Sequence, residues 1–153
     1  KKIKDKIKKV IKKINLFVYG SLREGFFNYD KYLAGKVVEK KDAILENMRL
    51  YHMPYKGYPA ITPGNDKVLG EIMVINEEEY DETVKDMDEM EGFISENNPE
   101  NEYHKIVLEV KNLQTNEKEK CFVYFYNKDK DKVFDSESVY IPNGDWKEYM
   151  LTK

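Results

Sequence analysis

Residues 16–25 constrain the fold most, because an apolar run there leads directly into a glycine turn. The first four residues, LFVY at 16–19, form a short, uninterrupted run rich in β-forming side chains, which predicts a buried strand. Gly20 and Ser21 follow at once, and glycine permits backbone angles that are closed to other residues. A buried strand that ends so abruptly leaves consecutive backbone N–H groups without ladder partners. Such groups need an acceptor, and an anionic ligand suits them.

Length and composition favour one domain with a hydrophobic core. The chain has 153 residues, and we expect residues 15–153 to form a single domain behind a basic segment, residues 1–14. Twelve tyrosines and seven phenylalanines favour strands over a helical bundle. No apolar run approaches the roughly 20 residues that span a membrane, so no membrane span is expected. The single cysteine, Cys121, fits a reducing compartment, and the basic N-terminal segment lacks the apolar core of a signal peptide. These features predict a cytoplasmic protein.

The charge is distributed unevenly along the chain. Residues 1–14 carry eight lysines and Asp5, whereas the rest of the chain has a net charge of −10. An acidic body argues against a nucleic-acid-binding domain, so no nucleic-acid partner is expected. The basic segment has a helical aliphatic stripe, which predicts an amphipathic helix or arm: Ile3, Ile7, Val10, Ile11 and Ile14. It either binds anionic lipid or RNA, or packs on the body, and the short stripe without Trp or Phe favours packing.

The remaining elements follow from periodicity and from the positions of glycine and proline. Helices are predicted over 28–35 and 77–91, with a short final helix to residue 150 after a turn at 143–146. Strands are predicted over 36–53 (one or two), 68–75, 103–111 and 121–126. The proline- and glycine-containing residues 54–64 are predicted to form a loop with a short extended piece over 58–62, and residues 127–139 a charged loop. Gly70 inside its strand indicates a bulge or a close backbone approach.

The helix over 77–91 has an irregularity at its end. Its apolar stripe is Tyr80, Val84 and Met87, and the next step of four residues falls on Glu91. A carboxylate at a core position would be partly desolvated, which raises its pKa toward the range useful for proton transfer. The alternative is a solvated carboxylate at a helix end, and the residues alone leave both interpretations open.

Other polar residues give weaker signals. Ser21 lies neither in a phosphate loop, since no Gly-Lys-Ser/Thr sequence follows, nor in a Gly-x-Ser-x-Gly nucleophile elbow. Only His52 and His104 could serve as its base, so Ser21 is interpreted as a turn residue. The two histidines and Cys121 lack the spacing of metal ligands, and neither a metal nor a cofactor is expected.

Several short blocks together resemble the gamma-glutamylcyclotransferase-like family. The blocks are VYGSLREG at 18–25 with Asn28, GYPA at 57–60, GE at 70–71, MDEMEG at 87–92, Tyr103, and GDW at 144–146. Their order and spacing agree with the family over residues 15–147, most closely with its small bacterial and gamma-glutamylamine branches. The resemblance implies an α+β fold, a compact mixed-sheet small β-barrel with flanking helices. It also places the site in a cavity at the end of the first strand.

The resemblance also implies roles for individual residues. The family's turn binds the α-amino and α-carboxylate groups of a γ-glutamyl moiety, and it corresponds to Tyr19, Gly20, Ser21 and Leu22. Glu91 corresponds to the catalytic glutamate, and Tyr103 to a tyrosine of the substrate-binding site. The chain departs from the family pattern in two places, both expected to bear on the acceptor side of the pocket. Lys105 stands where many relatives have arginine, and the bulky pair Phe26-Phe27 follows the first block.

The implied reaction is the release of 5-oxoproline and a free amine or amino acid from a γ-glutamyl amide. The substrate's own α-amine attacks its γ-carbonyl, so neither a Ser–His pair nor a metal is required. The enzyme holds the substrate in a near-attack conformation, and Glu91 carries a proton from the α-ammonium to the leaving nitrogen. The alternative is a catalytically silent member that binds a small metabolite or a protein partner. The oligomeric state is not indicated by the sequence.

Overall fold

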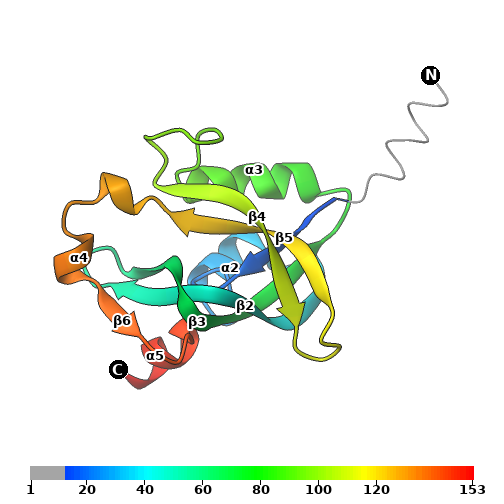
Figure 1. Cartoon of the computed structure of the whole chain (residues 1–153). Coiled ribbons are helices and arrows are strands. Elements are labelled where there is room, and N and C mark those ends of the chain that lie inside the picture. Colours follow the sequence, from blue (N-terminus) through cyan, green and yellow to red (C-terminus); the bar gives the residue numbers. More distant parts are fainter. Residues whose placement is uncertain (1–12) are drawn as a thin grey trace.

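A closed mixed β-barrel is the central element of the computed structural model, which describes residues 13–153 (Figure 1). The strand order is β3-β1-β5-β4-β2, and β2 pairs back with β3 to close the barrel. Among the strands of residues 13–153, only β1 and β5 pair in parallel. The strands are β1 (Asn15–Val18), β2 (Val37–Met53), β3 (Tyr58–Ile75), β4 (Tyr103–Asn112) and β5 (Lys118–Tyr126), and β6 (Val139–Ile141) extends the sheet beside β2. This architecture confirms the small barrel implied by the resemblance.

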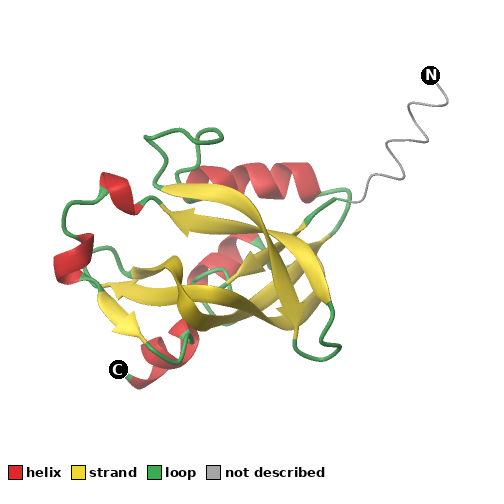
Figure 2. Ribbon diagram, viewed as in Figure 1, coloured by secondary structure: helices red, strands yellow, loops and turns green. Residues whose placement is uncertain are grey.

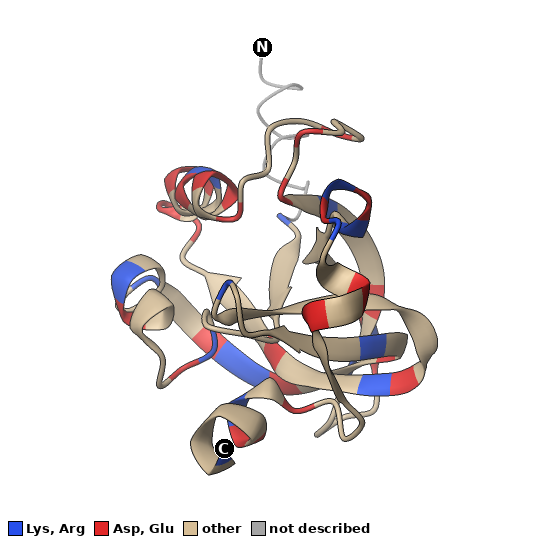
Figure 3. Cartoon of the chain, turned by 90° about the vertical axis from the view of Figure 1, so that its left-hand side faces the viewer, with Lys and Arg blue, Asp and Glu red and all other residues tan. Residues whose placement is uncertain are grey.

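The longest helix and the C-terminal helix lie clear of the sheet on opposite sides of it in Figure 2. The helices are α2 (Phe27–Tyr32), α3 (Tyr80–Met90), α4 (Phe134–Glu137) and α5 (Trp146–Thr152), together with a 3-10 turn, η1 (Lys128–Lys130). The predicted N-terminal helix lies almost wholly outside the described residues. Lys13, which is described, pairs at 2.9 Å with Asp81 on α3, a helix rich in acidic residues (Figure 3). No helix within residues 13–153 is long and apolar enough to cross a membrane.

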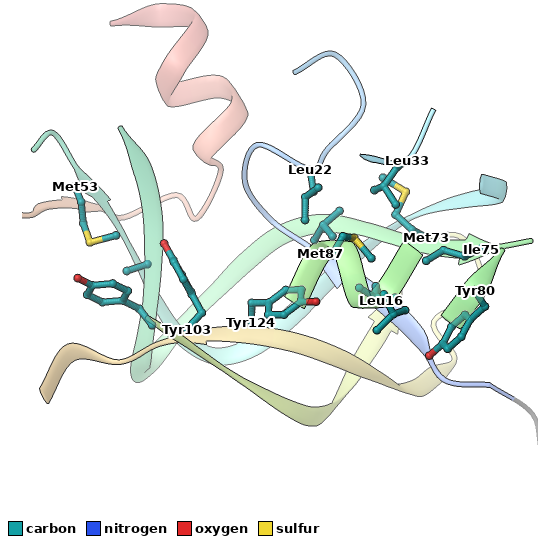
Figure 4. Packing of buried hydrophobic residues seen from close by; sticks show 14 of the residues in the cluster. Leu16, Leu22, Leu33, Met53, Met73, Ile75, Tyr80, Met87, Tyr103 and Tyr124 are labelled. Atoms are coloured by element: carbon teal, nitrogen blue, oxygen red, sulfur yellow. The ribbon is translucent and has the colours of Figure 1, made fainter. Parts of the chain in front are cut away.

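The first strand is buried on both faces, as its apolar run predicts. Leu16 and Val18 belong to the cluster beneath α3, where Met87 packs (Figure 4). Phe17 and Tyr19 point the other way, into a second cluster that contains Ile72 and Trp146. Successive side chains of a strand alternate between its faces, so a strand buried on both sides reads as an uninterrupted apolar run.

The prediction for residues 54–64 is confirmed only in part: the extended piece over 58–62 is strand, but the loop predicted after it is wrong. Only residues 54–57 form a turn, and β3 continues through Pro63 and Gly64 to Ile75. Proline is tolerated because this half of β3 pairs only with β2, which leaves its other edge open. A Cβ on Gly64 would overlap the Arg49 side chain, which would have to shift. The charged loop predicted over 127–139 is also more ordered than expected, since it contains η1 and α4.

Candidate active site

The turn that follows β1 leaves three consecutive backbone N–H groups free. The Arg23 N–H donates to the Gly20 carbonyl at 3.0 Å and closes the turn. The N–H groups of Gly20, Ser21 and Leu22, by contrast, have no acceptor within residues 13–153. Gly20 cannot be replaced without cost, because a Cβ there would lie 2.7 Å from Pro59 Cγ. The turn is therefore a narrow set of amide donors, the arrangement that suits an anion.

Helix α2 holds this turn from one side. The Asn28 side-chain amide donates to Ser21 Oγ at 2.8 Å, and the Tyr29 N–H donates to the Ser21 carbonyl at 3.1 Å. The hydroxyl of Ser21 is thereby held by an amide donor, and the two histidines bond elsewhere, His52 to Trp146 and His104 to Asn101. This supports the interpretation of Ser21 as a turn residue.

A buried ion-pair network holds the turn from the other side. The guanidinium of Arg23 contacts Glu71 at 3.3 Å and Asp145 at 3.1 Å. Glu71, in β3, is only 2% exposed, and it also accepts the Glu24 N–H at 3.0 Å. The preceding residue, Gly70, is needed because a Cβ there would overlap the Val18 carbonyl oxygen, so the predicted close approach is confirmed.

The block at 144–146 supports the same network from the C-terminal end. Gly144 has φ +70°, and a Cβ there would overlap the Lys67 carbonyl oxygen. Asp145 caps α5 by accepting the Glu148 N–H at 3.1 Å while it pairs with Arg23. Trp146 is buried and donates to His52 at 3.0 Å. This block therefore anchors the turn indirectly.

Glu91 lies at the end of the buried stripe of α3. Tyr80, Val84 and Met87 are buried, as predicted, and Glu91 is the C-cap residue. The chain then turns at Gly92, which has φ +68°. The N–H of Tyr103 donates to the Glu91 carbonyl at 3.1 Å, which joins the start of β4 to the end of the helix.

A cavity of about 230 Å³ lies between the turn and the end of α3. All six residues that the sequence singled out line it: Tyr19, Gly20, Ser21, Leu22, Glu91 and Tyr103. Further lining residues include Asn28, Tyr58, Pro59, Met90, Glu102 and Tyr124. The charged side chains that line it are Glu91 and Glu102, so the cavity combines an acidic side with a set of amide donors.

The carboxyl group of Glu91 has a strongly raised pKa. Burial, and then the negative charges of Glu102 and Asp88, raise this pKa from 4.5 to about 8. No hydrogen bond to the Glu91 side chain is found among residues 13–153, so its oxygens are available to a ligand. A carboxyl group with these properties can both accept and return a proton near neutral pH.

The two predicted site tyrosines form rigid walls. The Tyr19 hydroxyl donates to the Tyr124 carbonyl at 2.5 Å, and the Tyr103 hydroxyl donates to the Pro59 carbonyl at 2.6 Å. Burial raises the pKa of both phenols well above the usual range. Both hydroxyl groups therefore already donate their protons to backbone carbonyls. Each tyrosine can still offer a ligand a hydroxyl lone pair and the face of its ring.

The two departures from the family pattern lie away from the cavity lining. Lys105 pairs with Asp88 at 2.8 Å and lies over the Phe122 ring. Phe26 packs on Trp146 with ring centroids 5.1 Å apart, and Phe27 is exposed. Neither position lines the cavity, so the expected effect of these departures on the pocket is not direct.

Sequence reasoning missed Glu102 and Tyr124 as cavity residues. Tyr124 belongs to a strand predicted only as core, and Glu102 ends a polar loop in which no residue stands out. Glu102 could have been found from its place in the sequence, because it directly precedes Tyr103, a predicted site residue at the start of β4. Within residues 13–153, no group of three or more His, Cys, Asp or Glu side chains is arranged to hold a metal ion.

The first strand of this small mixed barrel ends in free amide donors, and a carboxyl group of raised pKa lies across the same cavity. These features describe a cavity built to bind a small anionic molecule and to exchange a proton with it. The family model described as gamma-glutamyl cyclotransferase, AIG2-like, matches residues 16–148, and the chain belongs to this family. Family membership supports an enzyme with gamma-glutamyl cyclotransferase activity in general.

Individual relatives agree with this assignment. The gamma-L-glutamyl-butirosin B gamma-glutamyl cyclotransferase of Niallia circulans is 28% identical over 137 residues, which cover 90% of this chain and 78% of that protein. An uncharacterized protein from Pyrococcus horikoshii has a TM-score of 0.57 at 23% identity, over 91% of this chain and 94% of its own. A mouse AIG2-like protein has a TM-score of 0.55 at 22% identity, over 73% and 76%. The two structures show the shared fold.

Proposed function

We propose that the protein releases 5-oxoproline and a free amine or amino acid from a γ-glutamyl amide. The observation that carries this proposal is that Glu91 and the free N–H groups of residues 20–22 line one cavity. The free N–H groups would bind the substrate α-carboxylate, as backbone donors at such turns bind anions. Ser21 would act as a binding residue, because its Oγ is held by Asn28.

Glu91 would carry the protons of the reaction. The ionised carboxylate takes a proton from the α-ammonium, and the freed amine attacks the γ-carbonyl to form the lactam C–N bond. The α-nitrogen begins with three protons and ends, as the lactam nitrogen, with one. The other two go to the leaving nitrogen as the γ-C–N bond breaks, so the products are 5-oxoproline and an ammonium ion. Because attacking and leaving groups both belong to the substrate, we propose that no metal takes part.

The raised pKa of Glu91 suits this role. A carboxyl group of ordinary pKa is a weak base toward an ammonium, whereas one whose pKa is raised to about 8 approaches the basicity of an amine. Proton transfer from the α-ammonium to Glu91, and from Glu91 to the leaving nitrogen, then each involves only a small change in free energy. Confinement of the γ-glutamyl chain in the cavity adds the proximity effect, which in favourable cases is worth about 7 kcal/mol.

The test is 5-oxoproline release from a panel of γ-glutamyl amines and γ-glutamyl amino acids, followed by mass spectrometry. We expect Glu91→Gln to lower kcat by roughly 100-fold or more, because the glutamine cannot carry a proton. Glu89→Gln, an exposed position on the same helix, is the matched control and retains activity. Undiminished turnover by Glu91→Gln would contradict the mechanism. Thermal stabilisation by γ-glutamyl compounds without any 5-oxoproline would instead favour the silent, metabolite-binding alternative.

A further inference from the structure

Glu102 is the second carboxylate of the cavity, and the proposed proton transfers leave it without a role. It lines the cavity together with Glu91, and it also lines an adjacent hollow of about 300 Å³. The rest of that hollow comes from the β2–β3 turn, β5 and the segment around η1: Tyr55, Lys56, Tyr126, Asn127, Lys130, Asp131, Lys132 and Val133. Glu102 therefore stands where the reaction cavity meets a second space.

The backbone fixes Glu102 beside Glu91. The Glu102 N–H donates to the Gly92 carbonyl at 2.9 Å, and a Cβ on Gly92 would lie 2.8 Å from Glu102 Cβ. Asn101, which is fully buried, accepts the Ile94 N–H at 2.6 Å and holds the intervening loop. Backbone hydrogen bonds and close packing thus hold the two carboxyl groups near each other, although repulsion between their charges opposes this arrangement.

Two side chains hold the Glu102 carboxylate without covering it completely. Lys56 Nζ lies 3.1 Å from one oxygen, and the Tyr58 hydroxyl donates to the other at 3.5 Å. The Glu102 side chain keeps 33% of its surface exposed. The carboxylate is therefore paired with a lysine and still has room to accept a further hydrogen bond.

We propose that Glu102 binds the leaving nitrogen of the substrate and stabilises it as it becomes an ammonium ion, with the rest of the leaving amine extending into the adjacent hollow. This inference rests on the proposed function. During the reaction the leaving nitrogen changes from a neutral amide to a cation, so a fixed carboxylate beside it is favoured more at the end of the reaction than at the start. Such differential stabilisation speeds the chemical step.

The other groups around Glu91 do not offer this charge. Tyrosines face Glu91 from four strands or strand ends, and burial raises the pKa of each above the usual range, so they stay neutral: Tyr19, Tyr58, Tyr103 and Tyr124. Asp88 also raises the pKa of Glu91 from its place on α3, but Asp88 does not line the cavity, and Lys105 at 2.8 Å and the Tyr124 hydroxyl at 2.6 Å hold it. Glu102 is the one lining carboxylate that is left to receive a cation in the described cavity.

The test compares two substrates that differ in whether the leaving group becomes charged. Ethylamine leaves γ-glutamyl-ethylamide as an ammonium ion, whereas p-nitroaniline leaves γ-glutamyl-p-nitroanilide and stays neutral. We expect Glu102→Gln to lower kcat on the ethylamide by about 10-fold or more and on the nitroanilide by less than about 3-fold. Glu102→Asp, which keeps the charge, should restore part of the difference.

Two further variants complete the design. Glu100→Gln, an exposed position in the same loop, should change neither rate. The acid limb of the kcat/KM profile should move to lower pH in Glu102→Gln, which removes a negative neighbour of Glu91, and to higher pH in Lys56→Gln, which leaves that charge unpaired. Equal losses on both substrates with an unmoved acid limb would overturn the inference while the proposed function stands. No 5-oxoproline from either substrate with the wild type would overturn both.

Discussion

Arg23, in the turn after β1, pairs with Glu71 of β3 at 3.3 Å, and the Glu71 side chain is almost fully buried. The two residues are 48 positions apart, so the pair forms only when the barrel closes. The same carboxylate accepts the Glu24 N–H, which fixes the chain on the far side of the turn. The position of the free amide donors therefore depends on a carboxylate that does not line the cavity.

Removal of the Glu71 charge should destabilise the fold. Glu71→Gln leaves the Arg23 guanidinium, with 11% of its side-chain surface exposed, without its buried partner. We expect a loss of about 3 kcal/mol in the free energy of unfolding, measured by urea denaturation. Asp145→Asn is the control, because asparagine still caps α5 and only the more exposed ion pair is lost, at a cost of about 1 kcal/mol. Equal losses would contradict the dominant role assigned to Glu71.

Gly144 should tolerate no side chain. Gly144→Ala combines a positive φ with overlap between the new Cβ and the Lys67 carbonyl oxygen, so we expect a loss of about 3 kcal/mol or more. Gly35→Ala is the matched control, because its φ is +80° but no atom lies within 4 Å of the place that a Cβ would take. That change should cost about 1 kcal/mol. Thermal unfolding of both variants separates backbone strain from overlap.

Stability should depend on pH through Glu91. Its pKa is raised from 4.5 to about 8 in the folded protein, so folding favours the protonated form. This contribution is fully present below pH 4.5 and is lost as the pH rises through about 8. We expect Glu91→Gln to match the wild type near pH 4.5 and to be more stable by on the order of 4 kcal/mol at about pH 9. A pH-independent difference, like that expected for the Glu89→Gln control, would show that Glu91 is not desolvated.

The pH dependence of kcat/KM should report the ionisation of Glu91 as well. In the proposed mechanism the ionised form of Glu91 takes the first proton, so kcat/KM should fall about tenfold per pH unit below a midpoint near 8. The measurement is 5-oxoproline release across the pH range, with a substrate that the wild type turns over. An acid limb near the ordinary carboxyl pKa of 4.5 would remove Glu91 from the role of base.

Local patterns predicted the parts of the site that lie within single elements. The apolar run over 16–19 predicted β1, the glycine after it predicted a turn, and the stripe of α3 led directly to Glu91. Part of the segment 54–64 was predicted as loop because proline and glycine usually interrupt strands. Here one edge of β3 is open, so the strand tolerates them. The substrate-binding role of Tyr103 and the roles of the turn residues remain predictions.

The sequence by itself determined β1, the turn after it, α3 and the place of Glu91 on the buried stripe of α3, because strand and helix periodicities are local properties of the chain. Only the tertiary structure decided that the turn, Glu91 and Glu102 share one cavity, because barrel closure brings together segments that lie about 70 residues apart. The tertiary structure also decided the pKa of Glu91. Burial of the Glu91 side chain and its closeness to the Glu102 charge both arise from chain packing outside the helix. Strand-to-turn geometry alone supplies a place for an anion, and the folded barrel places the carboxyl group of Glu91 in the same cavity.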